Sequence, residues 1–342
     1  MSAPVVSVVL PVFNAAAYLH EALDSLCTQT FAQFEIVLVD DASTDNSRLI
    51  AETYAQKDAR LNIIANTQGK GLAGALNSGL EAAAGDYIAR MDADDISLPS
   101  RLEKQLAFMQ AHPDIALCGT GIHYFGAGPA LDVLYPLTHE QIFCRMLFVN
   151  PLAHPTVLWR REVFLRAGLR YDPTSHAEDY DLWERSAQQL QLANLPDVLL
   201  RYRISPASFT HVQNEKQGRS VAEIFARQLA RLAVPTDDAT LQLHRMLSNE
   251  APLEQPQQLR RARAHILQLW QGNRRCAYYP AAAFRATLLY FWQTACLKYR
   301  GEHRLACKLY PCRELDTGTA PPDLQRPVQR LLTRLHGWLK HR

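Results

Sequence analysis

The first hundred residues alternate short runs of β-branched residues with longer segments of helical periodicity, and this alternation limits the fold more than any other feature. Each apolar run has the length of a buried strand, and the segments between the runs repeat their apolar residues at helical spacing. Strands that alternate with helices in this way form a parallel sheet covered on both faces, so the predicted fold class is α/β. The predicted strands are 5–10, 34–39, 61–64 and 86–91, and the predicted helices are 15–29, 45–57 and 72–84.

Three of the predicted strands are followed by segments suited to ligand binding, since ligands of such sheets lie beyond the carboxyl ends of the strands. These segments are 11–14, 40–43 and 92–95. Segments 40–43 and 92–95 concentrate carboxylates at neighbouring strand ends, where like charges repel by about 1 kcal/mol or more. A divalent cation is the simplest compensation for this repulsion.

The same loops argue against three other nucleotide-binding classes. Residues 11–17 contain no glycine, whereas a dinucleotide-binding turn needs glycine so that the backbone can approach a pyrophosphate. Gly69-Lys70-Gly71 lacks the spacing and the hydroxyl of a P-loop. A nucleotidyltransferase fits poorly, because the first turn has neither glycines nor basic residues to hold a triphosphate.

Asp92 and Asp94 are the strongest candidates for a metal site. Side chains alternate along an extended backbone, so both carboxylates could point toward one ligand. Carboxylate oxygens suit Mg²⁺ or Mn²⁺, which prefer few protein ligands together with phosphate oxygens. The alternative is a solvated acidic turn that caps a helix over residues 99–110.

Glu178 and Asp179 begin a second acidic motif, which spans residues 177–183. A carboxylate held near the N-terminal end of a helix and kept ionised could take a proton from a hydroxyl nucleophile. The alternative is that these are first-turn carboxylates that only face the helix dipole. Together, the two acidic motifs predict that one binds metal and the other transfers a proton.

Over about residues 4–215, the chain resembles family 2 glycosyltransferases with the GT-A fold. The resemblance rests on five segments that occur in this order: 6–14, 29–31, 34–45, 85–95 and 177–183. Residues 168–172 and the pair Tyr202-Arg203 are most similar to those of bacterial lipo-oligosaccharide β-1,3-N-acetylglucosaminyltransferases. The implied architecture is a GT-A domain followed by a smaller, mainly α-helical domain.

The resemblance implies an inverting transfer of a sugar from a UDP-sugar to a hydroxyl of a glycan or glycolipid acceptor, with UDP-GlcNAc as the first expectation. Mn²⁺ or Mg²⁺ would stabilise the departing diphosphate, and the pathway would be synthesis of bacterial surface polysaccharide or lipo-oligosaccharide. The resemblance implies a role for each of eight residues. They are Pro11, Phe13 and Asn14 in the nucleotide pocket, Asp41 on the uracil ring, Asp92 contacting the ribose or ordering the site, Asp94 on the metal, Asp179 as the base and Glu178 beside the acceptor. The alternative is a catalytically inactive protein that binds nucleotide sugar or acts as a scaffold at the membrane, and the intact acidic motifs favour the enzyme.

Histidine ligands are left open by the sequence. The related lipo-oligosaccharide enzymes carry a histidine two residues after the Tyr-Arg pair, where this chain has Ser205. His211 lies six residues further on and could replace it, and His154 is a candidate for the acceptor or phosphate side. A lone histidine is more often structural, so neither residue is placed in the first rank.

The C-terminal part of the chain is strongly basic. From Arg260 onward there are sixteen Lys and Arg against four Asp and Glu, although the net charge of the whole chain is only +2. The predicted domains are a glycosyltransferase domain over 1–220 and a basic helical domain over 221–342. A last predicted helix, 327–340, borders an apolar face with basic residues, so the predicted partner is an anionic membrane surface and not nucleic acid.

Three further features predict a cytoplasmic protein, peripheral on the inner face of the cytoplasmic membrane. No run of eighteen uncharged apolar residues could span a bilayer. The N-terminal apolar run is not preceded by the basic residues of a signal peptide. The seven cysteines form no CxxC pair, which is typical of reduced thiols.

Overall fold

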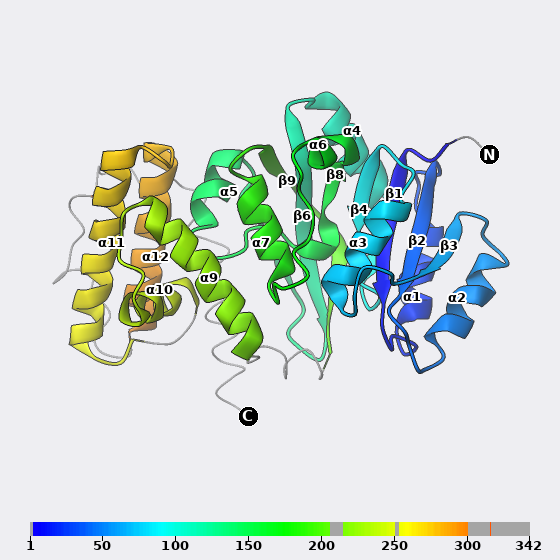
Figure 1. The fold of residues 1–342 in the computed structure, drawn as a ribbon, viewed down its shortest axis with the longest axis horizontal. Coiled ribbons are helices and arrows are strands. Elements are labelled where there is room, and N and C mark those ends of the chain that lie inside the picture. Colours follow the sequence, from blue (N-terminus) through cyan, green and yellow to red (C-terminus); the bar gives the residue numbers. More distant parts are fainter. Residues whose placement is uncertain (1–2, 206–214, 250–252, 300–314, 316–342) are drawn as a thin grey trace. The chain divides into compact units, whose positions relative to one another are not determined.

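The structure is a computed structural model that describes residues 3–205, 215–249, 253–299 and Leu315 (Figure 1). The chain divides into two compact units. Unit 1 comprises residues 1–139 and 152–217, and unit 2 comprises 140–151 and 218–342, each as far as the structure describes it. The predicted domain boundary after residue 220 stays a prediction.

Unit 1 is built on a sheet of nine strands among its described residues, in the order β3-β2-β1-β4-β8-β6-β9-β5, with β7 paired to β6. Strands β1 to β4 are parallel, as the alternating pattern predicts. Strand β8 runs antiparallel to both β4 and β6, so the sheet is mixed beyond β4. The strands are β1 (Val6–Val12), β2 (Phe34–Asp40), β3 (Leu61–Ala65), β4 (Tyr87–Arg90), β5 (Ile96–Ser97), β6 (Ile115–Gly126), β7 (Leu131–Val133), β8 (Leu158–Arg160) and β9 (Gln191–Ile204).

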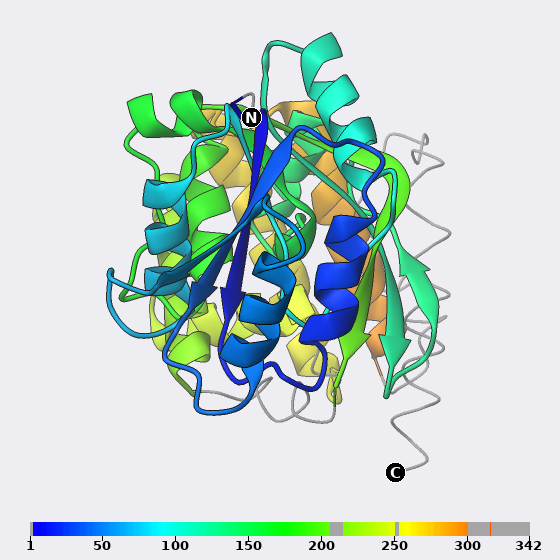
Figure 2. The same ribbon diagram turned by 90° about the vertical axis from the view of Figure 1, so that its right-hand side faces the viewer.

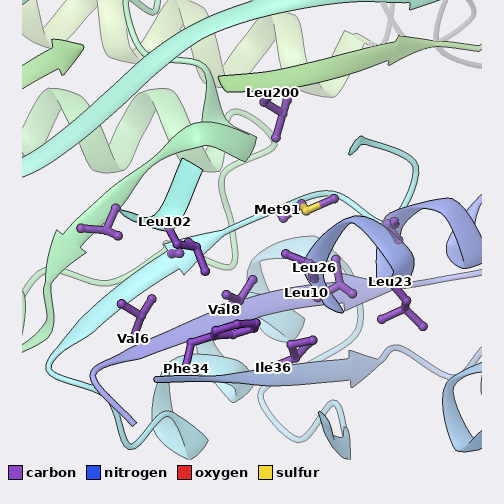
Figure 3. Close-up of a cluster of buried hydrophobic side chains, with 14 of the residues drawn as sticks. Val6, Val8, Leu10, Leu23, Leu26, Phe34, Ile36, Met91, Leu102 and Leu200 are labelled. Atoms are coloured by element: carbon purple, nitrogen blue, oxygen red, sulfur yellow. The ribbon is translucent and has the colours of Figure 1, made fainter. Parts of the chain in front are cut away.

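Helices cover both faces of the parallel part of the sheet. Leu23 and Leu26 of α1 pack with Val8 and Leu10 of β1 in one buried cluster (Figure 3). Helix α3 lies on the opposite face of the strands from α1, as Figure 2 also shows. The helices of unit 1 are α1 (Leu19–Cys27), α2 (Ser47–Ala55), α3 (Leu72–Ala82), α4 (Arg101–Ala111), α6 (Arg161–Arg166) and α7 (Glu178–Ser186), with a 3₁₀ turn at His154–Thr156. The α/β fold class predicted from the sequence is confirmed.

The first helix begins four residues later than predicted, at Leu19 instead of Ala15. The backbone N–H of Ala15 donates to Ser47 Oγ at 2.8 Å, and that of Ala16 donates to Asp45 Oδ2 at 3.0 Å. These bonds hold the segment after β1 against the segment after β2. The apolar periodicity of residues 15–18 therefore belongs to a loop at the ligand-binding edge of the sheet.

Unit 2 is helical over its described residues. Its helices are α5 (His139–Arg145), α9 (Glu215–Arg231), α10 (Asp238–Asn249), α11 (Pro256–Cys276) and α12 (Ala281–Lys298). The first residue of α5 and the first three residues of α9 are assigned to unit 1. Phe148, Leu229, Leu269 and Phe291 belong to one buried cluster that joins these helices. Helix α11 begins with Pro256 and has a capping box between Gln255 and Gln258.

No helix among the described residues is both long and apolar enough to cross a membrane. The predicted interfacial helix at 327–340 lies outside the described residues.

Candidate active site

The end of β1 and the loop after it carry three of the predicted nucleotide-binding residues, which differ in exposure. Pro11 is buried inside β1, where it pairs with Val39 of β2. Phe13 is 54% exposed, so its ring is available to a ligand. Asn14 has a φ of 49°, and its side-chain Oδ1 accepts a hydrogen bond of 2.8 Å from the backbone N–H of Thr44. Asn14 therefore fixes the two strand-end loops against each other.

Asp41, predicted to contact the uracil ring, follows β2 and is nearly buried. Its Oδ1 accepts a hydrogen bond of 2.7 Å from Asn66 Nδ2, and its Oδ2 accepts one of 2.9 Å from the backbone N–H of Gly71. The two bonds orient the carboxylate and bring the loop after β3 to the same edge of the sheet. Lys70 lies in this loop.

Asp92, Asp94 and Asp95 come together just beyond β4. One carboxylate oxygen of each lies within 4.8 Å of those of the other two, a spacing at which they could hold one metal ion. The segment is a turn, not extended backbone, because the N–H of Asp95 donates to the carbonyl of Asp92 at 3.4 Å. The turn adds Asp95 to the pair that side-chain alternation selects in the sequence.

Asp95 is the most buried member of this group, with 1% of its surface exposed. Its Oδ1 accepts a hydrogen bond of 2.8 Å from the backbone N–H of Arg203, whereas its buried Oδ2 has no hydrogen-bond partner among the described residues. A buried oxygen without a donor is costly unless a proton or a cation meets it. The donor set therefore fits a divalent cation.

The pKa values of the group agree with this arrangement. Burial, and then the charge of Asp92, raise the pKa of Asp94 to about 6. Burial and the charges of Asp92 and Asp94 raise the pKa of Asp95 well above its ordinary value. A bound cation would favour the ionised carboxylates, since opposite charge lowers a carboxyl pKa.

Three arginines surround the acidic turn. Arg90 at the end of β4 is fully buried, and its guanidinium contacts both carboxylate oxygens of Asp92. Arg203 in β9 donates from Nε to the carbonyl of Asp94 at 2.7 Å. Arg101 in α4 is as buried as Arg90, and its positive charge acts on Asp95.

Glu178 and Asp179 form the first turn of α7, and they share an electrostatic environment with the acidic turn. The charge of Asp92 raises the pKa of both residues, and the guanidinium of Arg90 lowers it. Burial is the largest influence: it raises the pKa of Asp179 and, with the charge of Asp179, that of Glu178 to about 7. The fold thus brings together two motifs that lie more than eighty residues apart in the sequence.

Burial raises the pKa values of Glu178 and Asp179 by more than the N-terminus of α7 lowers them. The sequence suggests a base kept ionised by its helix, but the pKa of Asp179 is raised. Its Oδ1 accepts a hydrogen bond of 2.7 Å from the backbone N–H of Tyr180, which favours the ionised form and fixes the carboxylate.

His154 lies in a different environment from the acidic residues. Its Nε2 forms a hydrogen bond of 2.8 Å with the hydroxyl of Tyr171, and its ring meets Trp183 edge to face. Burial, with the nearby charge of Arg90, holds the pKa of His154 well below its ordinary value, so the ring is neutral. His211 lies outside the described residues.

Sequence reasoning missed Asp95, Arg90 and Arg203 as parts of the site. Asp95 could have been found from the motif 92–95. An acidic residue next to a predicted metal-binding pair is itself a candidate metal ligand when the backbone of the segment forms a turn. Arg90 reads as part of an apolar strand, and Arg203 meets the turn only through the pairing of distant strands.

The chain is similar to known proteins in sequence and in fold. Residues 7–164 match the family described as Glycosyl transferase family 2. The amylovoran biosynthesis glycosyltransferase AmsE of Erwinia amylovora is 35% identical over 220 residues, which are 62% of this chain and 80% of AmsE.

Two solved structures are similar in fold. One is TarS 1–349 of S. aureus in complex with UDP-GlcNAc, with a TM-score of 0.58 and 19% identity over 86% of this chain and 89% of that chain. The other is the mannosyltransferase PcManGT from Pyrobaculum calidifontis in complex with GDP-Man and Mn²⁺, with a TM-score of 0.53 and 18% identity over 90% of this chain and 87% of that chain.

The mixed sheet with its acidic strand-end turn is the architecture of a GT-A glycosyltransferase. The chain belongs to glycosyl transferase family 2, and the protein is a glycosyltransferase.

Proposed function

We propose that the protein transfers a sugar from a UDP-sugar to a hydroxyl of a glycan or glycolipid acceptor, with inversion at the anomeric carbon and in dependence on a divalent cation. The observation that carries the proposal is the proximity of the acidic turn 92–95 to Glu178 and Asp179: the charge of Asp92 acts on both of these partly buried carboxyl groups. UDP-GlcNAc, the ligand named for the TarS structure, is the first donor to test.

The charges at the site support a divalent cation. Five carboxylates of the two acidic motifs lie among three guanidiniums, of which that of Arg203 also pairs with Glu21 at 3.0 Å, so carboxylates outnumber guanidiniums. The groups are Asp92, Asp94, Asp95, Glu178 and Asp179 against Arg90, Arg101 and Arg203. Asp94 would hold the ion with Asp95, whose Oδ2 has no other partner among the described residues. When bound, Mn²⁺ or Mg²⁺ supplies positive charge that stabilises the departing diphosphate.

The residues of the strand-end loops would bind the nucleotide. Phe13 offers an exposed ring to the base, and Asp41 has a fixed carboxylate at the same edge of the sheet. Pro11 and Asn14 shape the loop that carries Phe13. Asp92 would contact the ribose with the part of its carboxylate that is open to solvent.

Asp179 would act as the catalytic base. The acceptor hydroxyl oxygen forms a bond to the anomeric carbon, the bond from that carbon to the diphosphate oxygen breaks, and Asp179 receives the hydroxyl proton. The hydrogen bond from the Tyr180 N–H fixes the carboxylate of Asp179 at the start of α7. Glu178, one residue earlier in the same turn, would contact the acceptor.

The relative AmsE takes part in amylovoran biosynthesis, and this supports a role in synthesis of bacterial surface polysaccharide or lipo-oligosaccharide. An acceptor of the latter kind would place the protein at the inner face of the cytoplasmic membrane. The basic segment proposed to bind an anionic membrane surface, 327–340, lies outside the described residues.

The direct test is a transfer assay with a panel of UDP-sugars and GDP-mannose, with Mn²⁺, with Mg²⁺ and with EDTA. We expect nucleotide release from a UDP-sugar only when a divalent cation is present. Release from GDP-mannose alone would contradict the donor class. Tight UDP binding without turnover of any donor would instead support the inactive, sugar-nucleotide-binding alternative.

A further inference from the structure

Arg90 is a charged side chain placed where charge is costly. It lies at the end of β4 with 1% of its surface exposed, and its buried Nε has no hydrogen-bond partner among the described residues. Removing a guanidinium from water is costly before any partner is counted, as it is for other buried ions. A chain that needed only packing at this position would not require an arginine.

The partner of Arg90 is a carboxylate of the proposed site. Two guanidinium nitrogens contact the two carboxylate oxygens of Asp92, and 28% of the Asp92 side chain remains exposed. The pair therefore spans from the interior to the open edge of the sheet. A bidentate contact fixes the plane of the carboxylate as well as its position.

The neighbouring Arg101 shows that burial alone does not explain the arrangement. Its guanidinium is equally buried, but it donates to main-chain carbonyls, those of Pro155 at 2.6 Å and of Arg90 at 3.3 Å. Arg101 thus links segments of the fold, whereas Arg90 contacts a side chain of the acidic turn.

The positive charge of Arg90 also makes the acidic turn feasible. Three carboxylates with oxygens within 4.8 Å of one another repel strongly in a buried setting. A guanidinium behind Asp92 offsets one of these charges and keeps Asp92 from rotating toward Asp94. Asp94 and Asp95 then keep oxygens available for a cation.

We propose that Arg90 is a positioning residue, which acts through Asp92 to hold the acidic turn in the arrangement that binds the cation and the donor nucleotide. This inference rests on the proposed function. It assigns Arg90 no contact with the donor, the acceptor or the cation.

The test compares Arg90→Lys with Arg160→Lys, a control at a partly buried arginine of β8 that donates to the main-chain carbonyls of Ile115 and Met109 and has no part in the proposed site. UDP binding in the presence of Mn²⁺ is measured by calorimetry at a temperature well below the unfolding midpoints of both variants. We expect both variants to lose thermal stability, but the Kd to rise by about tenfold or more for Arg90→Lys and by less than about threefold for Arg160→Lys. Equal rises in Kd would overturn the positioning role.

A double-mutant cycle with Asp92→Asn tests whether Arg90 acts through Asp92. In the Asp92→Asn background, Arg90→Lys should change the Kd by less than about twofold, because the contact is already lost. Additive effects would overturn the inference. If Arg90→Lys does not fold, Asp92→Glu is the variant to test, because it keeps the negative charge but moves the carboxylate away from Arg90. Unchanged UDP affinity in Asp92→Glu would overturn the inference.

The two proposals fail in different ways. If the wild-type protein binds no UDP with Mn²⁺, the proposed function fails. If the wild type binds but the two lysine variants are equal, only the role of Arg90 fails.

Discussion

The guanidinium Nε of Arg203 donates a hydrogen bond of 2.7 Å to the main-chain carbonyl of Asp94. The backbone N–H of Arg203 also donates to Asp95 Oδ1, so one residue of β9 holds two residues of the acidic turn. The rings of Tyr18 and Phe125 lie 4.6 and 4.4 Å from this guanidinium and keep it in place. The shape of the proposed cation site therefore depends on strands far along the sequence.

Replacement of Asp179 by Asn should remove turnover and leave donor binding intact. The amide keeps the size of the side chain but does not accept the acceptor proton, so we expect kcat to fall by about 10²- to 10⁴-fold. The Kd of UDP with Mn²⁺ should stay within about threefold, because Asp179 does not contact the donor nucleotide in our account. Asp114→Asn, which changes an exposed aspartate, is the control. Transfer at the wild-type rate would exclude Asp179 as the base.

The pH dependence of kcat should show an acid limb. Burial raises the pKa of Asp179, and the pKa of Glu178 is raised to about 7. A base works only when ionised, so the rate should rise as the pH passes upward through these raised pKa values and should fall below them. The measurement is kcat from pH 5 to 8 with saturating donor and Mn²⁺. A flat profile over this range would argue against a carboxylate base in this environment.

Unit 2 should lose stability in mild acid because of a buried histidine pair. His244 Nδ1 lies 3.0 Å from His265 Nε2, and burial lowers their pKa values to about 4 and about 3. In the unfolded chain both would titrate near their ordinary value of about 6.5. The two neutral histidines therefore contribute their full stability above about pH 6.5. As the pH falls from there toward 4, their contribution to the free energy of unfolding decreases by about 2.7 kcal/mol per pH unit for the pair.

The measurement for this pair is the free energy of unfolding from denaturant titrations between pH 7 and 5. His265→Gln should reduce the slope by about 1.4 kcal/mol per pH unit, since one of the two buried imidazoles is removed. His112→Gln, at the exposed residue that follows α4, is the control. An unchanged slope in His265→Gln would show that the pair does not control acid stability.

Gly79→Ala should destabilise unit 1 although alanine favours helices. A Cβ at this position of α3 would lie 2.4 Å from a methyl carbon of Val9 in β1. The helix gains about 1 kcal/mol from the substitution, while overpacking a core costs about 1–3 kcal/mol. The unfolding midpoint should therefore fall.

Gly218→Ala in α9 is the matched control for the same exchange. The added Cβ would meet the end of the flexible Arg245 side chain at 3.2 Å, which can move aside. We expect the midpoint to rise slightly in this variant. A rise in Gly79→Ala as well would show that α3 does not pack as closely on β1 as the structure has it.

The sequence predicts the first half of the fold because its signals there are local. The runs around Val8 and Ile36 are buried on both faces, so their composition alone distinguishes strands from the helices between them. The second half has no such signal. Strand β8 has three residues, and its antiparallel place between β4 and β6 follows from packing that no short segment encodes.

The candidate site was predictable to the same degree. Asp92, Asp94, Glu178 and Asp179 occur in motifs, and the structure brings these motifs into one electrostatic environment. The contribution of Arg90 was not predictable, because an arginine inside a strand usually reaches solvent. Only its burial and its contact with Asp92 show that it belongs to the site.

The most direct test of the account is a calorimetric titration of UDP into the wild-type protein and into Asp94→Asn, with and without Mn²⁺. We predict that the wild type binds UDP only with Mn²⁺ and that Asp94→Asn does not bind it. Without metal, the thermal stability of Asp94→Asn should equal or exceed that of the wild type, because the substitution removes one of several like charges that lie close together. Binding of UDP by Asp94→Asn with wild-type affinity and the same Mn²⁺ requirement would contradict the assignment of the acidic turn as the cation and donor site.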